Sequence, residues 1–114
     1  MIVKPFIKWA GGKTQLLPQI RNKYPKELGK TINKCCEPFI GGGAVLFDIL
    51  SNYTLEEVLI NDINAELTNT YKQIKNHLDI LVGELSEMQE HFWKLNTEER
   101  KEYYYEKRER FNYL

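Results

Sequence analysis

The stretch that decides the fold reads Cys35-Cys36-Glu37-Pro38-Phe39-Ile40-Gly41-Gly42-Gly43-Ala44-Val45-Leu46-Phe47. It predicts a strand that ends near Glu37, because Pro38 cannot donate to a sheet ladder. The three glycines permit positive φ and leave no side chain between the backbone and a ligand. The apolar residues that follow supply the buried face of a helix. The stretch therefore predicts a strand, a glycine turn and a helix, with backbone N–H groups directed at whatever lies above the turn.

A second stretch complements the first. Val58-Leu59-Ile60 predicts another short strand, which Asn61-Asp62 ends. Asp62 lies about 20 residues past the glycines, where dinucleotide-binding folds place an acid that binds ribose hydroxyls. The pattern predicts half of a Rossmann-type unit and a nucleoside-bearing cofactor. In an alternative interpretation, the glycines only tighten the packing of strand against helix.

The glycine spacing narrows the class of cofactor. The dinucleotide fingerprint G-x-G-x-x-G would require a glycine at position 46, which is Leu46, so NAD and FAD are disfavoured. An acid followed by Phe-x-Gly-x-Gly stands here instead, formed by Glu37, Phe39, Gly41 and Gly43. This loop resembles the cofactor loop of S-adenosylmethionine-dependent methyltransferases.

A second glycine pair lies near the N-terminus. Gly12-Lys13-Thr14 looks like the end of a phosphate-binding P-loop, but that motif requires a glycine where Ile7 stands, so an NTPase is disfavoured. We expect the pair to open a helix with Lys13 in its first turn, where the helix dipole disfavours a cation. Lys13 therefore indicates an anionic ligand such as a carboxylate; the alternative is a solvated lysine.

Composition excludes several classes of protein. The 114 residues have zero net charge, with 16 basic and 16 acidic side chains, so no strong overall field attracts nucleic acid. The adjacent Cys35 and Cys36 indicate a buried, reduced strand, and no metal site is expected, since His77 and His91 have no ligand cluster around them. No apolar run approaches the roughly 20 residues of a membrane span, so we expect a soluble, cytoplasmic protein.

Three motifs in order resemble one family. They are Phe6–Lys13, Glu37–Val45 and Ile60–Asn64, the last followed by Glu66, Leu67 and Tyr71. Together they resemble the start of a Dam-type DNA adenine-N6 methyltransferase, strongly over positions 6 to 75. Residues 103–112 are similar, more weakly, to a later helix of that family.

The resemblance implies a site-specific, restriction-modification type of enzyme that transfers methyl from S-adenosylmethionine to adenine N6 in DNA. It also implies cofactor-binding roles for Trp9, Lys13, Phe39, Gly41, Gly43 and Asp62. Lys13 would meet the methionine carboxylate, and Asp62 would accept the ribose hydroxyls. Trp9 would offer an aromatic face to the cofactor; the alternative for Trp9 is a buried core aromatic.

One family motif is missing. Dam-type enzymes have an Asp-Pro-Pro-Tyr motif after a target-recognition region, and here no two prolines are adjacent. We therefore name no catalytic residue. We expect residues 1–114 to form a partial catalytic domain, the cofactor-binding half, without the target-recognition region and inactive by itself. DNA is the expected partner of the full-length parent.

The second half of the chain is predicted to be helical. An apolar stripe with alternating spacings of four and three runs through Leu67, Tyr71, Ile74, Leu78, Leu81, Leu85, Met88 and Phe92. It is expected to pack in a core, or alternatively to bind a partner. Asn76 and Thr97 are candidate helix caps. The rival function is a non-catalytic helical interaction module that uses this stripe.

The predicted fold is α/β: the N-terminal fragment of a Rossmann-like methyltransferase domain, with few parallel strands and mostly helical. Strands are expected near 34–37 and 57–61, and helices near 12–23, 43–52, 64–75, 77–93 and 97–112. Because a two-stranded sheet leaves its edges open, self-association through an edge or through the stripe is also expected.

Overall fold

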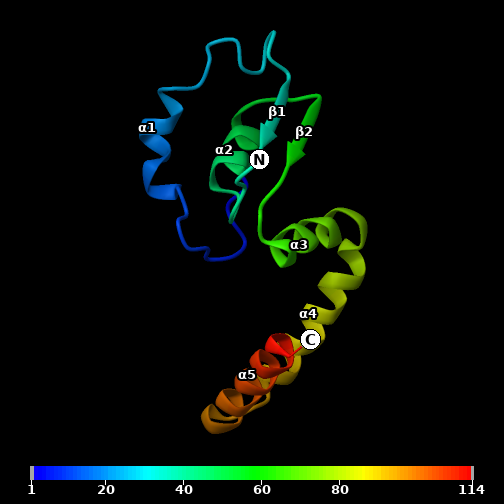
Figure 1. Cartoon of the computed structure of the whole chain (residues 1–114). Helices are drawn as coiled ribbons and strands as arrows, with labels where there is room; N and C mark the ends of the chain where they lie inside the picture. The colour runs from blue at the N-terminus through cyan, green and yellow to red at the C-terminus, as the bar shows by residue number, and fades with distance from the viewer. Residues whose placement is uncertain (1, 114) are drawn as a thin grey trace. The chain divides into compact units, whose positions relative to one another are not determined.

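The structure is a computed structural model that describes residues 2–113. The chain divides into two compact units, Met1–Thr70 and Tyr71–Leu114, and helix α3 crosses the boundary. In chain order the elements are the 3₁₀ turn η1 (Thr14–Leu16), α1 (Leu17–Arg21), β1 (Lys34–Glu37), α2 (Ala44–Asn52), β2 (Glu57–Ile60), α3 (Ala65–Asn76), α4 (Leu78–Trp93) and α5 (Thr97–Asn112). Figure 1 labels the α-helices and the strands.

The first unit is built on a β1–α2–β2 crossover. The two strands pair in parallel, from Lys34 opposite Glu57 to Glu37 opposite Ile60. The pairing continues past both strands, because Asn61 N–H donates to the Glu37 carbonyl at 2.8 Å and Ile40 N–H donates to the Asn61 carbonyl at 3.0 Å. The predicted α/β class, with few parallel strands and mostly helical, is confirmed, and both strands lie where the sequence placed them.

The two faces of this sheet differ in burial. Side chains alternate along a strand, so Cys36 and its register partner Leu59 point to the same face. That face is open: Cys36 is exposed and Leu59 is 63% exposed. Cys35, on the other face, is half-buried, and both cysteines are free thiols. The expectation that the cysteine pair is buried is therefore wrong for Cys36, because residues 2–113 cover only one face of the strands.

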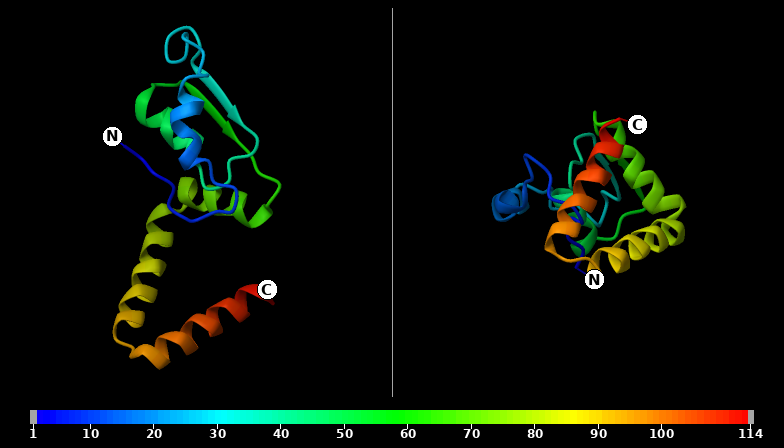
Figure 2. Two further views of the ribbon diagram at one scale, coloured as in Figure 1. Left: turned by 90° about the vertical axis from the view of Figure 1, so that its left-hand side faces the viewer. Right: turned by 90° about the horizontal axis from the view of Figure 1, so that it is seen from below.

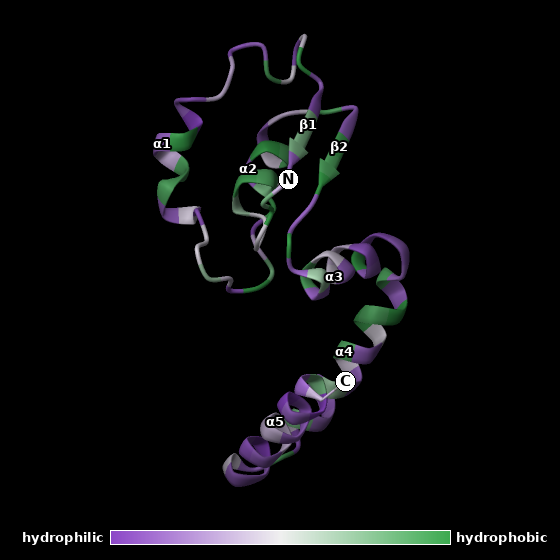
Figure 3. Cartoon of the chain, viewed as in Figure 1, coloured by the Kyte–Doolittle hydropathy of each residue, from purple (hydrophilic) through white to green (hydrophobic). Residues whose placement is uncertain are grey.

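Apolar side chains next to the glycine turn form the core of the first unit. In this unit, Figure 3 shows hydrophobic colouring on α2, on the later part of each strand and on part of α1. The buried apolar residues of this unit are Leu28, Ile40, Ala44, Leu46, Ile49 and Leu67. Asp48 is buried among them on α2, at 6% exposure. Asp48 was not among the residues predicted to be buried.

The first helix is shorter than the predicted 12–23. Gly11 has φ +77°, and Gly12 N–H closes a turn on the Trp9 carbonyl at 3.1 Å, so the helical segment begins only at η1. Pro18 lies in the first turn of α1, where its missing N–H costs no hydrogen bond. Lys13 therefore precedes the helix, and the helix-dipole argument for an anionic partner at Lys13 is wrong.

Both predicted helix caps differ from the observed ones. Asn76 is the last residue of α3, and α4 begins at Leu78, where the N-cap residue His77 makes no side-chain capping hydrogen bond. At α5 the cap is Asn96, not Thr97. The Asn96 side chain accepts from Glu99 N–H at 2.9 Å, and the Glu99 carboxylate accepts from Asn96 N–H at 3.0 Å. Thr97 is already helical, because this reciprocal capping box places the helix start one residue earlier.

In the second unit, α4 and α5 contact each other near the turn that joins them. The His91 and Tyr103 rings lie 4.9 Å apart, and Arg100 covers the Phe92 ring at 4.9 Å. Farther along, the two helices diverge (Figure 2). The part of the apolar stripe on α4 is consequently exposed to solvent, with Leu78 50% and Leu85 54% exposed. For α4, the expectation of a core-packed stripe is wrong.

Candidate functional site

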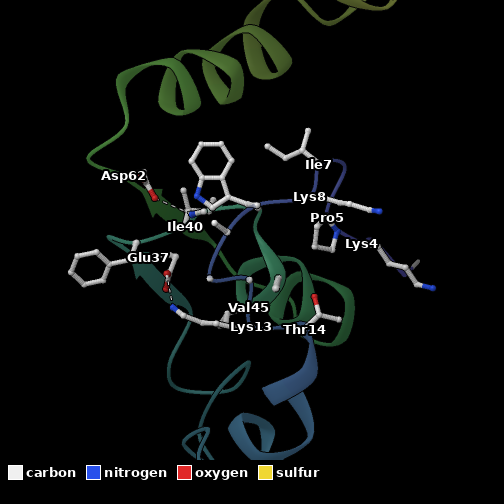
Figure 4. Close-up of a pocket in the computed structure, with 18 of the residues that line it drawn as sticks. Lys4, Pro5, Ile7, Lys8, Lys13, Thr14, Glu37, Ile40, Val45 and Asp62 are labelled. Atoms are coloured by element: carbon white, nitrogen blue, oxygen red, sulfur yellow. Dashed lines mark hydrogen bonds and ion pairs between the residues drawn. The ribbon is translucent and has the colours of Figure 1, made fainter. Parts of the chain in front are cut away.

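A pocket of about 720 Å³ lies in the first unit, within the size range of sites that bind small molecules. The residues that line it come from the N-terminal segment, the end of β1 with the glycine turn, the start of α2, and Asp62 beyond the end of β2 (Figure 4). Five of the six sequence-predicted site residues line this pocket: Trp9, Lys13, Phe39, Gly41 and Asp62. Parallel strands end at the same edge of a sheet, and this geometry brings Asp62 to the glycines.

The Asp62 carboxylate holds two backbone N–H groups. Its Oδ2 accepts from Gly41 N–H at 3.0 Å, and its Oδ1 accepts from Asn64 N–H at 3.0 Å. The hydrogen bonds from Asn64 and Gly41 keep the pKa of Asp62 below its usual range, so the group is an anion at neutral pH. A carboxylate oxygen has more than one acceptor direction, and both oxygens can still accept from a ligand.

Trp9 lies directly on the glycine turn. A Cβ added at Gly41 would stand 3.2 Å from Trp9 Cδ1, and one at Gly42 would stand 3.4 Å from Trp9 Cβ. Gly41 also has φ +53°, which side chains other than glycine rarely adopt. These glycines are therefore required for the indole to approach the loop backbone. Trp9 is 39% exposed, so it is a wall of the pocket and not the buried core aromatic of the alternative interpretation.

Lys13 has a partner inside the pocket. Its Nζ lies 4.0 Å from Glu37 Oε1, at the end of β1 (Figure 4). The Lys13 side chain is 42% exposed, whereas the Glu37 side chain is only 18% exposed. Glu37 was predicted only as part of the glycine-loop motif and not as a site residue. Its position on the strand directly before Pro38 and the glycines was the available signal.

The two remaining predicted residues have different surroundings. Phe39 lines the pocket but is 73% exposed. Gly43 is not among the lining residues; it stands before α2 with φ +89°, and its carbonyl accepts from Phe47 N–H at 2.8 Å. Gly43 therefore starts the helix that supports the site.

A polar cluster around Asp48 of α2 was not predicted from the sequence. Asp48 Oδ1 accepts from Arg21 Nε at 2.9 Å and from the Arg21 terminal nitrogen, and Asp48 Oδ2 accepts from the Tyr24 hydroxyl at 3.1 Å. The Arg21 hydrogen bond, followed by that of Tyr24, lowers the pKa of Asp48. Burial, followed by the Asp48 hydrogen bond, raises the pKa of Tyr24 to about 12. A lone carboxylate within the apolar run of α2 was the only sequence signal.

The chain belongs to the D12 class of N6 adenine-specific DNA methyltransferases, whose family pattern matches residues 9–114. That family uses S-adenosylmethionine. The pocket geometry fits such a cofactor: an ionised acid stands beside a side-chain-free turn, and an aromatic wall faces them.

Individual relatives agree with this family. The type II methyltransferase M.MjaIII of Methanocaldococcus jannaschii is 53% identical over 113 residues, which is 98% of this chain and 39% of the relative. The type II methyltransferase M1.LlaDCHI of Lactococcus lactis subsp. cremoris is 40% identical, over 90% of this chain and 31% of the relative. A DNA adenine methylase of Haemophilus influenzae is 34% identical, over 96% of this chain and 34% of the relative. The chain thus spans between about a third and two fifths of these relatives.

Across residues 2–113, the helices are all too short or too polar to traverse a lipid bilayer.

Proposed function

We propose that the chain is the cofactor-binding part of a site-specific DNA methyltransferase that transfers methyl from S-adenosylmethionine to adenine N6. The observation that supports this most directly is the Asp62–Gly41 hydrogen bond beneath Trp9. It joins an ionised acceptor, a bare glycine turn and an aromatic wall in one pocket.

The pocket residues would divide the cofactor among them. Asp62 would accept the ribose hydroxyls on its remaining acceptor directions, while its bonds to the loop keep it ionised. Trp9 would pack its face on the ligand. Lys13 would meet the methionine carboxylate by exchanging its Glu37 contact, which is long at 4.0 Å and weak for a part-exposed pair.

Methyl transfer needs more than these residues. The bound cofactor supplies an activated methyl group, and the reaction requires the target amine to be held in line with it. The family motif for that task, Asp-Pro-Pro-Tyr, is absent from the 114 residues. We propose that they bind the cofactor weakly and do not methylate DNA by themselves.

Calorimetric titration with S-adenosylhomocysteine at millimolar concentration tests the cofactor site. Asp62→Ala should weaken binding by about tenfold or more, because two hydrogen bonds to a charged group are lost. Asp79→Ala in α4, an exposed aspartate of the second unit, is the matched control and should bind like the wild type. Equal binding by wild type and Asp62→Ala would show that the site is assigned wrongly.

Inactivity is tested separately with tritiated S-adenosylmethionine and adenine-containing DNA. Incorporation of tritium into the DNA that rises with the amount of protein would contradict the proposed inactivity.

One face of α5 supports the proposed DNA partner. Lys101, Tyr104, Arg108 and Phe111 have spacings of three, four and three, which place them on one side of the helix, and all are exposed. Glu98, Glu102, Glu106 and Glu109 have the same kind of spacing on another side. Basic side chains alternate with aromatic ones on this side of α5, and the glutamates lie on another side. Such a surface suits contact with the phosphate backbone of DNA.

This DNA surface has its own test. Arg108→Ala should weaken binding of a short duplex and reduce its salt dependence, whereas Glu106→Ala should not weaken it. Equal affinities and equal salt dependence for wild type and Arg108→Ala would show that this face of α5 does not contact DNA.

The rival function, a helical interaction module, has one observation in its favour. Three apolar side chains of the stripe on α4, Leu78, Leu85 and Met88, are exposed. Sedimentation at several protein concentrations, with and without S-adenosylhomocysteine, distinguishes the interaction module from the proposed cofactor-binding function. A dedicated interaction module should associate tightly and ignore the ligand.

A further inference from the structure

Two segments that flank the pocket are anchored to the same helix, α2. The first anchor is at Val3, whose N–H donates to Ser51 Oγ at 2.8 Å. Ser51 Oγ in turn donates to the Phe47 carbonyl at 2.6 Å, which fixes the hydroxyl on the helix. The start of the N-terminal segment is thereby attached to α2.

The second anchor is the Asp48 cluster. Arg21 and Tyr24, which follow the pocket segment in the chain, both donate to the Asp48 carboxylate. Asp48 and Ser51 are three residues apart on α2, so they share one side of the helix. A single helix face therefore holds the chain on both sides of the segment that includes Trp9 and Lys13.

Between the anchors, the backbone has little regular structure of its own. No helix or strand is present from Val3 to Lys13, and one turn, from Gly12 N–H to the Trp9 carbonyl, is closed by a backbone hydrogen bond of 3.1 Å. The segment nevertheless lies close to the glycine turn: a Cβ at Gly42 would stand 3.4 Å from the Ile7 carbonyl oxygen. Its position must come from contacts outside the segment.

We propose that Asp48 and Ser51 are positioning residues for the cofactor site. By holding both ends of the pocket segment on α2, they place Trp9 and Lys13 over the glycine turn from which the same helix begins. This inference rests on the proposed function for its ligand, but the placement of Trp9 can be measured without any ligand.

Trp9 can report its own position. The chain has two tryptophans, so Trp93→Phe in the second unit leaves Trp9 as the single indole. In that background we compare Asp48→Asn, Ser51→Ala and the control Asp79→Asn by acrylamide quenching and by titration with S-adenosylhomocysteine. Circular dichroism confirms that each variant is folded.

We expect Asp48→Asn and Ser51→Ala to raise the quenching of Trp9, and Asp79→Asn to leave it unchanged. Asp48→Asn should also weaken S-adenosylhomocysteine binding by about tenfold, because a displaced wall loses its contacts with the ligand. When Trp9→Ala is combined with Asp48→Asn, the loss of binding free energy should be smaller than the sum of the losses from the two single changes, since both remove the same contact with the ligand.

Several outcomes would overturn the proposal. Quenching equal to the control in both variants would show that the anchors do not place Trp9. Weaker binding without a change in quenching, or fully additive losses, would assign Asp48 a general structural role. If Asp48→Asn does not fold, Tyr24→Phe and Ser51→Ala decide by the same quenching measurement. If the parent binds no ligand, the proposed function fails, while the quenching result still decides the positioning role.

Discussion

The Asp62 carboxylate accepts the Gly41 backbone N–H at 3.0 Å and so joins the end of β2 to the turn after β1. Both residues line the pocket, so this bond joins two parts of its wall. In the observed geometry, Asp62 both shapes the glycine turn and remains available as an acceptor. The acid and the turn are therefore one structural unit, and a change in either is expected to alter the other.

Gly41→Ala should destabilise the protein by about 1–2 kcal/mol, because alanine is strained at φ +53°. It should also weaken S-adenosylhomocysteine binding, since the new methyl group would lie 3.2 Å from the Trp9 ring. Urea unfolding and calorimetry measure the two effects. The control is Gly83→Ala in α4, where nothing lies within 4 Å of the added carbon. That change should stabilise the helix by about 0.5–1 kcal/mol; a Gly41→Ala variant that behaves like it would refute the close approach.

Asp48 should make the stability of the protein sensitive to acid. Its pKa is lowered in the folded state from a usual value of 3.8, so the unfolded chain takes up this proton first. The stabilisation is complete above pH 3.8 and is lost as the pH falls through the folded-state pKa. Relative to Asp48→Asn, the wild type should be more stable by about 1–2 kcal/mol at pH 7. This difference should shrink below about pH 4, as measured by urea unfolding; a difference independent of pH would contradict the ionised cluster.

Tyr24 should have the opposite dependence, at alkaline pH. Burial and the Asp48 hydrogen bond raise its pKa from 10.0 to about 12, so the unfolded chain loses this proton first. The stabilisation is complete below pH 10 and disappears as the pH rises through about 12. Thermal unfolding between pH 8 and 11.5 should therefore show the wild type losing stability relative to Tyr24→Phe. Parallel curves for the two proteins would contradict the raised pKa of Tyr24.

The two cysteines should differ in reactivity toward a thiol reagent. Burial, followed by the charge of Glu37, raises the pKa of Cys35, and this keeps its thiol protonated and slow. Cys36 is exposed on the open sheet face. Cys35→Ser should therefore retain the fast phase of Ellman's reagent, and Cys36→Ser should lose it. The reverse assignment would mean that the exposed sheet face is the one with Cys35.

The strand–turn–helix–strand order was determined by the sequence alone, because its causes are local. Pro38 ends β1, the glycines permit positive φ, and the short apolar run Val58–Ile60 defines the second strand. The spacing of Asp62 from the glycines also follows from the crossover, since both strands end at one edge. The bounds of α3, α4 and α5 could be predicted to within a residue or two, because the periodicity of apolar residues is also a local property.

Only the tertiary structure decided which groups the local pattern brings into contact. The Asp48–Arg21–Tyr24 cluster and the Val3–Ser51 anchor join residues far apart in the chain, and no spacing rule relates them. The pairing of Lys13 with Glu37 and the exposure of Leu78 and Leu85 were likewise undetermined. Burial and pairing depend on what packs against a residue from elsewhere, whereas helix and strand periodicity reports only which residues share a face.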